Sequence, residues 1–351
     1  AASMTRASKE SRAKKKKETG KAPAVAKRVT SPKKGKSSPA ASFVLPGEKD
    51  QEIVLNKHSL SLTNLNKLYW PKEKISKGDM IRYYDLAAEY ILPYLVDRPQ
   101  SLNRFPNGIQ GESFFQKDVG NSVPDWIRTY RYKSESDGKY KRFLVATDKA
   151  SLIYMANLGC IEMNPWNSRT GKPDYPDWCV IDLDPGKGNT FNQVIEVARR
   201  IKAWLDRWDI PAYCKTSGST GIHVYIPLAA KYTFDQSRMF AEIIVTAVPK
   251  EMPDITSIER SLSKRKGKIY LDFLQNRQIQ TIAAPYSLRP KPGATVSMPL
   301  PWEEVKPGLK MSDYNIGNAL ERMRRGPDIF KGVLGPGINL DKILKDMNRE
   351  H

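Results

Sequence analysis

The sequence is poor in the residues that build disulfide frameworks and zinc sites. It has three cysteines and three histidines in 351 residues, and no two cysteines form a CxxC pair. A disulfide scaffold needs closely spaced pairs of cysteines, and a structural zinc site needs Cys and His ligands at characteristic spacings. The sequence therefore argues against both, and we expect Cys160, Cys179 and Cys214 to be reduced core residues of a cytosolic protein.

Long apolar runs are missing as well. The longest mainly apolar stretch, 152–163, is interrupted by Asn157, and it is shorter than the roughly 20 residues that span a bilayer. The first residues contain no apolar core of a signal peptide. We therefore expect a soluble protein with no membrane partner.

Acidic residues are outnumbered, with 38 Asp and Glu against 58 Lys and Arg and a net charge of +20. Residues 1–50 hold 14 of the basic residues and only 4 acidic ones, so half of the excess lies there. The excess favours a nucleic-acid partner, and a solubilising surface is the alternative. Residues 1–42, mainly Lys, Ala, Ser and Pro, predict a disordered basic linker cut from a longer protein, whereas 43–351 has the composition of a globular domain.

The spacing of apolar residues predicts several regular elements. Helices are expected over 77–94 and 191–208, and a further helix is expected to open at Asp235 as its N-cap. The expected strands are 142–147, 152–155, 179–184, 212–216, 222–227 and 268–274.

Three aspartates lie in predicted strands, where burying a carboxylate costs free energy. Asp182 and Asp184 are two apart in a predicted strand, so their side chains leave the same face. They repel each other unless a cation lies between them, and hard divalent ions take such oxygen ligands. A pair of turn or cap aspartates explains the spacing equally well. Asp272 is predicted in mid-strand, where a metal shared with the pair would compensate its burial.

A turn rich in glycine and serine, Ser217 to Gly221, joins two predicted strands. Its amides and hydroxyls can cradle phosphate, although it lacks the Gly-Lys-Ser/Thr ending of a Walker A loop. His223 follows the turn, and a hydrogen-bonded core histidine is the alternative there. Phe114 and Phe115 stand beside cationic residues, as in single-strand binding sites, but such doublets more often lie in a core.

These runs together resemble the motifs of the archaeo-eukaryotic primase superfamily, above all the polymerase domain of bacterial DNA ligase D. The resemblance covers about residues 52–310 and implies an α/β (α+β) fold, in which a mixed sheet with an RRM-like catalytic half has flanking helices. It is carried by Asp182-Leu-Asp-Pro-Gly, Lys215-Thr-Ser-Gly-Ser-Thr-Gly-Ile-His223, Leu271-Asp-Phe-Leu-Gln-Asn276, Leu68-Tyr-Trp-Pro71, Arg104-Phe-Pro-Asn-Gly108, Phe114-Phe-Gln-Lys117, Ala156-Asn-Leu-Gly159 and Ala284-Pro-Tyr-Ser-Leu-Arg289.

The resemblance implies a nucleotide and metal site. Two divalent ions, manganese favoured over magnesium, would be held by Asp182, Asp184 and Asp272. The triphosphate of an NTP or dNTP would lie at Ser217 and His223 with support from Arg289, and Gln275 would lie beside the sugar.

The resemblance also implies contacts with DNA. Phe114 and Phe115 would pack against the template or the incoming base, and Lys67 and Lys77 would hold the 5′-phosphate of a downstream strand. The expected DNA-binding cations are Lys67, Lys77, Arg104 and Lys117.

The implied activity is template-dependent nucleotidyl transfer that fills gaps and extends 3′ ends with (ribo)nucleotides in non-homologous end joining. The implied partners are 5′-phosphorylated gaps or double-strand-break ends, a Ku homodimer and a ligase domain of the same polypeptide, at the nucleoid in a bacterial cytoplasm. A primer-independent primase and a non-catalytic end-binding module are the alternatives, and the three aspartates argue against the second. The sequence departs from the family at Asn164, where His is common, and at Thr220, where many members have Lys.

Overall fold

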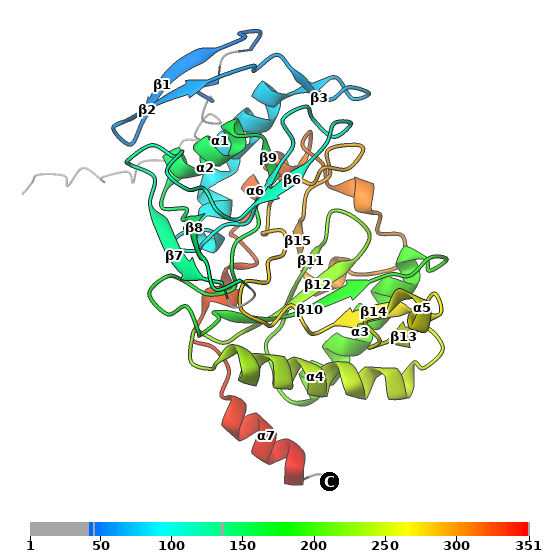
Figure 1. Cartoon of the computed structure of the whole chain (residues 1–351). Coiled ribbons are helices and arrows are strands. Elements are labelled where there is room, and N and C mark those ends of the chain that lie inside the picture. The colour runs from blue at the N-terminus through cyan, green and yellow to red at the C-terminus, as the bar shows by residue number, and fades with distance from the viewer. Residues whose placement is uncertain (1–41, 45, 135–136, 350–351) are drawn as a thin grey trace, which may run out of the picture. The chain divides into compact units, whose positions relative to one another are not determined.

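A six-stranded mixed sheet forms the lower half of the computed structural model, which describes residues 42–44, 46–134 and 137–349 (Figure 1). Its strand order is β13-β14-β10-β12-β11-β15, and every pair is antiparallel except β13–β14. In that order the strands are Thr256–Ser257, Ile269–Asp272, Trp178–Asp184, Ile222–Pro227, Tyr213–Thr216 and Pro299–Leu300.

Two helices, α3 (Phe191–Arg207) and α4 (Phe234–Glu251), cover one face of this sheet (Figure 1). Apart from the short β13 and α5 that precede β14, the chain order β10-α3-β11-β12-α4-β14 is the βαββαβ arrangement of RRM-like folds. Thr190 starts α3 because its side chain accepts a hydrogen bond from the Gln193 amide in a capping box. The RRM-like half and the mixed sheet expected from the sequence are thus confirmed.

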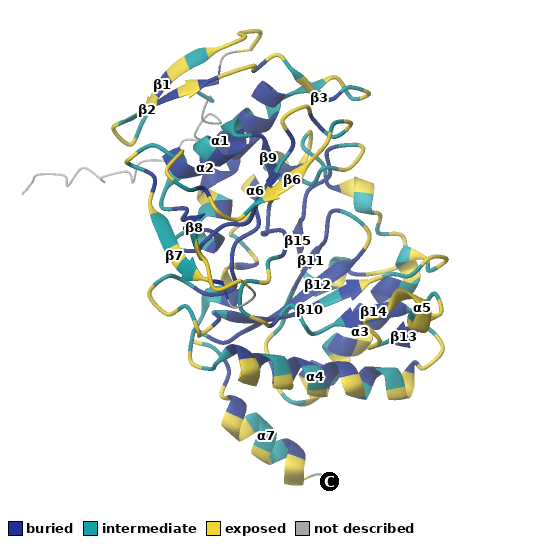
Figure 2. Ribbon diagram, in the orientation of Figure 1, coloured by how far each residue is buried: buried dark blue, intermediate teal, exposed yellow. Residues whose placement is uncertain are grey.

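The other half is built around two packed helices, α1 (Lys77–Ile91) and α2 (Lys149–Asn157), both largely buried (Figure 2). Beside them lies a three-stranded sheet of order β6-β5-β9, with strands Phe114–Gln116, Leu102–Arg104 and Cys160–Glu162. Three two-stranded sheets complete this half: β1–β2 (Gln51–Leu55, His58–Leu62), β3–β4 (Leu68–Trp70, Ile75–Ser76) and β7–β8 (Thr129–Lys133, Tyr140–Leu144).

Short helices fill the connections and the C-terminal part. The α-helices are α5 (Leu262–Arg265), α6 (Ala319–Arg324) and α7 (Leu340–Arg349). The 3₁₀ helices are η1 (Leu92–Tyr94), η2 (Trp302–Glu304), η3 (Met311–Asp313) and η4 (Lys331–Leu334).

The strand expected over 152–155 is wrong, because these residues lie inside α2. Asp148 accepts from the Ser151 amide at 2.9 Å and the Ser151 hydroxyl accepts from the Asp148 amide at 3.0 Å, a capping box that starts a helix. The run reads as a strand in sequence because α2 is buried on several sides.

Other element boundaries shift by a few residues. The helix expected over 77–94 changes to 3₁₀ geometry at Leu92, next to Pro93. Asp235 is not an N-cap: Thr233 caps α4 and Asp235 lies in its first turn. The strand expected over 268–274 ends at Asp272.

Apart from Ser42, the linker expected over 1–42 lies outside the described residues. All three cysteines are buried and free. None of the helices in the described part of the chain is long and apolar enough to cross a membrane.

Candidate active site

A row of polar residues crosses four adjacent strands of the six-stranded sheet. Asp272 on β14 is the Cα partner of Asp182 on β10, which is in turn the partner of His223 on β12. His223 is the partner of Lys215 on β11. Directly paired residues on neighbouring strands share one face, so the register gathers two carboxylates, an imidazole and an ammonium side by side.

The row lies on the face of the sheet that α3 and α4 leave free. Cys179 donates from Sγ to the carbonyl of Ser237 in α4 at 3.7 Å, so the odd-numbered residues of β10 face the helices. Asp182 and Asp184 are even-numbered and therefore point away from them. The expectation that the two aspartates share a face with Asp272 agrees with this register.

Burial and neighbouring carboxylates raise the pKa values of Asp182 and Asp184. Burial, together with the negative charges of Asp184 and Asp272, raises the pKa of Asp182 to about 7. Burial also raises the pKa of Asp184, against the opposing effect of Arg265, whose guanidinium lies 3.8 Å away. A cation among these groups would relieve their repulsion, and carboxylate oxygens are the ligands that hard divalent ions prefer.

Each carboxylate also has a protein partner. Asp182 Oδ1 lies 3.4 Å from His223 Nε2, and Asp272 Oδ1 accepts from the Leu274 amide at 2.8 Å. Within the described ranges, no three His, Cys, Asp or Glu side chains converge tightly enough to hold one ion as they stand. The donor chemistry and the shared face therefore fit a divalent-metal site, and ion binding requires the carboxylates to turn from these partners.

The loop between β11 and β12 encloses a single oxygen. Ser217 Oγ accepts hydrogen bonds from the amides of Ser219, Thr220 and Gly221 at 3.0, 3.0 and 2.9 Å. Gly221 is required, because a Cβ there would lie 2.0 Å from the carbonyl oxygen of Leu183 on β10. Consecutive amides that converge on one oxygen form the kind of nest that binds anions.

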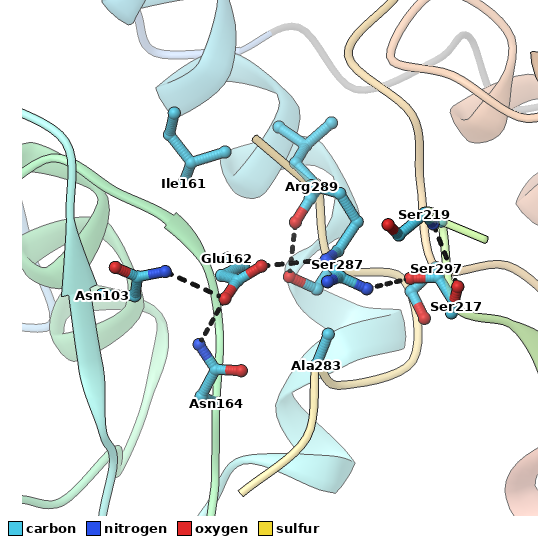
Figure 3. A network of polar contacts seen from close by, with 12 residues as sticks. Asn103, Ile161, Glu162, Asn164, Ser217, Ser219, Ala283, Ser287, Arg289 and Ser297 are labelled. Carbon is cyan, nitrogen blue, oxygen red and sulfur yellow. Dashed lines mark hydrogen bonds and ion pairs between the residues drawn. The ribbon is translucent and has the colours of Figure 1, made fainter. Parts of the chain in front are cut away.

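The ion pair between Arg289 and Glu162 holds the β11–β12 loop in place (Figure 3). Arg289 donates from Nε to Glu162 Oε2 at 2.8 Å and from Nη1 to the carbonyl of Ser217. The other oxygen of Glu162 accepts from the amides of Asn103 and Asn164 at 3.1 and 3.2 Å (Figure 3). Asn164, one of the two positions that depart from the family, thus anchors the partner of Arg289.

His223 is buried and electrically neutral. Burial, then the charges of Lys215 and Arg289, hold its pKa well below the ordinary value of 6.5. Burial likewise holds the pKa of Lys215 well below 10.5. We missed Glu162 and Lys215 as site residues from the sequence. Strand register brings Lys215 next to His223, and the ion pair with Arg289 brings Glu162 to the site.

Gln275 lies beside Asp272. Its Nε2 is 3.3 Å from Asp272 Oδ2, and its Oε1 is buried with no hydrogen-bond donor among the described residues. The two residues line a small cavity of about 120 Å³ together with Arg260 and Arg277. A buried acceptor beside the carboxylates can accept a hydrogen bond from a sugar hydroxyl.

Phe114 and Phe115 are exposed on β6, at 47% and 60% of their full surface. The core alternative for this doublet is therefore wrong. The Arg104 guanidinium lies over the Phe114 ring, 5.3 Å from its centre, and Lys117 is exposed just beyond the strand. Open rings next to cations are suited to stacking with unpaired bases.

Lys67 and Lys77 lie next to each other, since the Lys77 amide donates to the Lys67 carbonyl at 2.8 Å. Lys67 Nζ donates to the Pro106 carbonyl at 2.8 Å, and Lys77 Nζ donates to Thr63 O and Asn157 Oδ1 at 2.7 and 2.9 Å. Burial, then the charge of Lys67, lowers the pKa of Lys77 to about 8. Two adjacent cations of this kind favour a dianion.

Comparisons with known proteins identify relatives of this chain. Residues 76–330 match the family described as LigD, primase-polymerase domain. The chain is 33% identical over 268 residues to the bifunctional non-homologous end joining protein LigD of Bacillus subtilis, covering 76% of this chain and 43% of that protein. It is 31% identical over 246 residues to the multifunctional non-homologous end joining protein LigD of Mycolicibacterium smegmatis, covering 70% and 32%.

A solved structure is similar as well. The polymerase domain from Mycobacterium tuberculosis ligase D, in complex with DNA, superposes with a TM-score of 0.74 at 28% identity, covering 80% of this chain and 99% of that one. The chain thus spans less than half the length of the curated relatives but nearly all of this polymerase domain. The family match starts at residue 76, so Lys67 lies before it and the aspartates, the β11–β12 loop and Arg289 lie within it.

Proposed function

The chain belongs to the LigD primase-polymerase family and is a primase-type nucleotidyltransferase, and we propose that it fills short gaps and extends 3′ ends of broken DNA. The observation that carries this proposal is the register that sets Asp272, Asp182 and His223 side by side, next to an amide-lined loop. The relatives are named as non-homologous end joining proteins, and we propose the same process for this chain.

The aspartates form the frame of the reaction site. Asp182, Asp184 and Asp272 would hold two divalent ions, with manganese preferred to magnesium. When bound, such ions lower the pKa of a primer 3′-hydroxyl and neutralise charge on the triphosphate. Burial, with the negative charges of Asp184 and Asp272, raises the pKa of Asp182 to about 7, which supports this role because bound cations would offset the repulsion among the carboxylates.

The neighbouring groups would position the nucleotide. The loop amides around Ser217, the Arg289 guanidinium and His223 suit the triphosphate of an NTP or dNTP. The buried oxygen of Gln275 would accept from a sugar hydroxyl. No protein nucleophile is needed, since the primer hydroxyl attacks the phosphorus and pyrophosphate leaves.

The surface groups would bind the DNA. Phe114 and Phe115 offer rings to the template or incoming base, with Arg104 and Lys117 near the backbone. Lys67 and Lys77 would hold the 5′-phosphate beyond a gap. A Ku homodimer and a ligase domain of the same polypeptide are the proposed partners, in the bacterial cytoplasm at the nucleoid.

A one-nucleotide extension assay tests this function. A gapped duplex, a plain primer–template and a template without primer are each offered with NTPs or dNTPs and manganese, magnesium or chelator. We expect templated, metal-dependent addition that is fastest on the 5′-phosphorylated gap. Synthesis without a primer would identify a primase instead, and binding to ends without any addition would identify a recruiting module.

A further inference from the structure

Lys215 is a buried lysine to which the proposed chemistry gives no role. It lies on β11 with none of its surface exposed, and no carboxylate of the described residues is within ion-pair distance of it. A buried ammonium without a counter-ion is costly and persists only where its hydrogen bonds are satisfied. The partners of Lys215 therefore indicate what it does.

An ammonium has three N–H groups, and Lys215 Nζ has three partners. These are the Ala283 carbonyl at 2.8 Å, Ser297 Oγ at 2.6 Å and His223 Nδ1 at 2.7 Å. The carbonyl can only accept. The Ser297 hydroxyl donates its hydrogen bond to the Thr216 carbonyl at 2.8 Å, so toward the lysine Ser297 Oγ is an acceptor. The third N–H is left for the imidazole nitrogen, which then carries no proton.

The other side of the ring leads to the same assignment. His223 Nε2 faces Asp182 Oδ1 at 3.4 Å. A carboxylate oxygen accepts a hydrogen bond from a ring nitrogen that carries a proton. A neutral imidazole has one protonated nitrogen, so the hydrogen bond made by one nitrogen determines whether the other carries the proton. Lys215 from one side and Asp182 from the other both select the proton on Nε2.

We propose that Lys215 is a positioning residue that holds His223 in the Nε2–H tautomer, so that the ring presents a donor to the phosphates of the incoming nucleotide. The inference rests on the proposed function for the ligand, but the tautomer itself is a property of the nucleotide-free protein. Without the lysine, a ring protonated on Nδ1 would turn a lone pair toward the anion. Such a ring would repel the triphosphate instead of binding it.

Nitrogen-15 NMR of the histidine side chains tests the tautomer directly. The sequence has only three histidines, so His58→Gln and His223→Gln suffice to assign the signals. In the unaltered chain without nucleotide, we expect a pyridine-type signal for Nδ1 of His223 and a pyrrole-type signal for Nε2. In Lys215→Met, which keeps the length and removes the donors, only Asp182 still favours this tautomer, so we expect signals of both tautomers.

Kinetics on the gapped duplex test the consequence. A charged hydrogen bond to phosphate corresponds to about a tenfold or larger change in affinity, so we expect Lys215→Met to raise KM for the nucleotide by about that factor. His223→Gln should act similarly, and the double variant should be no worse than His223→Gln alone. Cys214→Ala, on the same strand but the opposite face, is the matched control for a general loss of packing.

The outcomes separate the two hypotheses. A proton on Nδ1 of His223 in the unaltered chain would overturn the assignment whatever the activity, because the lysine would then be an uncharged acceptor. Additive losses in the double variant would also overturn it. If the chain extends no primer yet shows the expected nitrogen signals, the proposed function fails and the tautomer assignment stands. The measurement on the unaltered chain remains decisive even if Lys215→Met does not fold.

Discussion

Arg289 and Glu162 form a partly buried ion pair whose guanidinium also donates to the Ser217 carbonyl at the start of the β11–β12 loop. The pair joins β9 of one half of the fold to the β11–β12 loop of the other. Glu162 is buried and its carboxylate oxygens accept from Arg289, Asn103 and Asn164, so it acts on the loop through Arg289.

Glu162→Gln should therefore loosen the loop without removing any group that touches the substrate. We expect KM for the nucleotide to rise severalfold with little change in DNA affinity. The unfolding free energy should fall by about 1.5–3 kcal/mol, the range for hydrogen bonds to charged groups. Extension kinetics and thermal melting measure both, with the exposed Glu303→Gln as control. An unchanged KM would show that the ion pair only stabilises the fold.

Lys67 and Lys77 are expected to recognise the 5′-phosphate beyond a gap. Replacing both by alanine should weaken binding to 5′-phosphorylated gaps about tenfold or more, and leave binding to 5′-hydroxyl gaps nearly unchanged. Fluorescence anisotropy with the two duplexes measures this, and the exposed neighbour Lys72→Ala controls for loss of charge. Equal losses of affinity for both duplexes would show that the lysines contribute only a general electrostatic attraction to DNA.

The same pair predicts a pH dependence. The pKa of Lys77 is lowered to about 8 in the free protein, and a bound phosphate raises it because opposite charges favour the ammonium. Binding then takes up a proton when the solution is above that pKa. The preference for 5′-phosphate should be complete well below pH 8 and decline as the pH rises through about 8. A preference that stays constant up to pH 10 would contradict the assignment to Lys77.

The exposed rings of β6 predict a contact with unpaired bases. Phe114→Ala and Phe115→Ala should each weaken binding to a template overhang, since stacking contributes about 1–3 kcal/mol per base. Melting should hardly change because both rings are exposed. Tyr175→Ala removes another exposed ring and should leave DNA affinity intact. Full affinity in both phenylalanine variants would show that the template binds elsewhere on the protein.

The basic segment before the fold predicts a salt effect. Deleting residues 1–42 should leave turnover and melting nearly unchanged while weakening non-specific DNA binding. It should also make that binding less dependent on salt, because fewer counterions are released. Titrations at several salt concentrations measure the slope. An inactive or unfolded truncation would show that the segment belongs to the fold.

The RRM-like half could be predicted from sequence because its elements carry clear local signals. Apolar residues at helical spacing predicted α3, and β10 and β12 are mainly apolar strands bounded by polar turns, whereas the N-cap of α4, Thr233, was missed in favour of Asp235. The apolar run 152–155 misled the prediction, because a buried helix and a buried strand look alike over so few residues. Its capping box at Asp148 was the missed signal.

The site could be predicted only in part. Spacing puts Asp182 and Asp184 on one face, but pairing with Asp272 depends on strand order, which no local pattern encodes. The family resemblance supplied that link. Lys215 was missed for the same reason, because its role follows from a partner on the neighbouring strand.

We propose above all that Asp182, Asp184 and Asp272 hold the metal ions for nucleotidyl transfer. Single-nucleotide extension on a gapped duplex with manganese is the most direct test of this role. We expect Asp182→Ala and Asp272→Ala each to abolish extension, while DNA affinity and melting stay close to those of the unaltered chain. Asp254→Ala, an exposed aspartate in the loop before β13, should extend normally. More than a trace of manganese-dependent incorporation by either Asp182→Ala or Asp272→Ala would contradict the account.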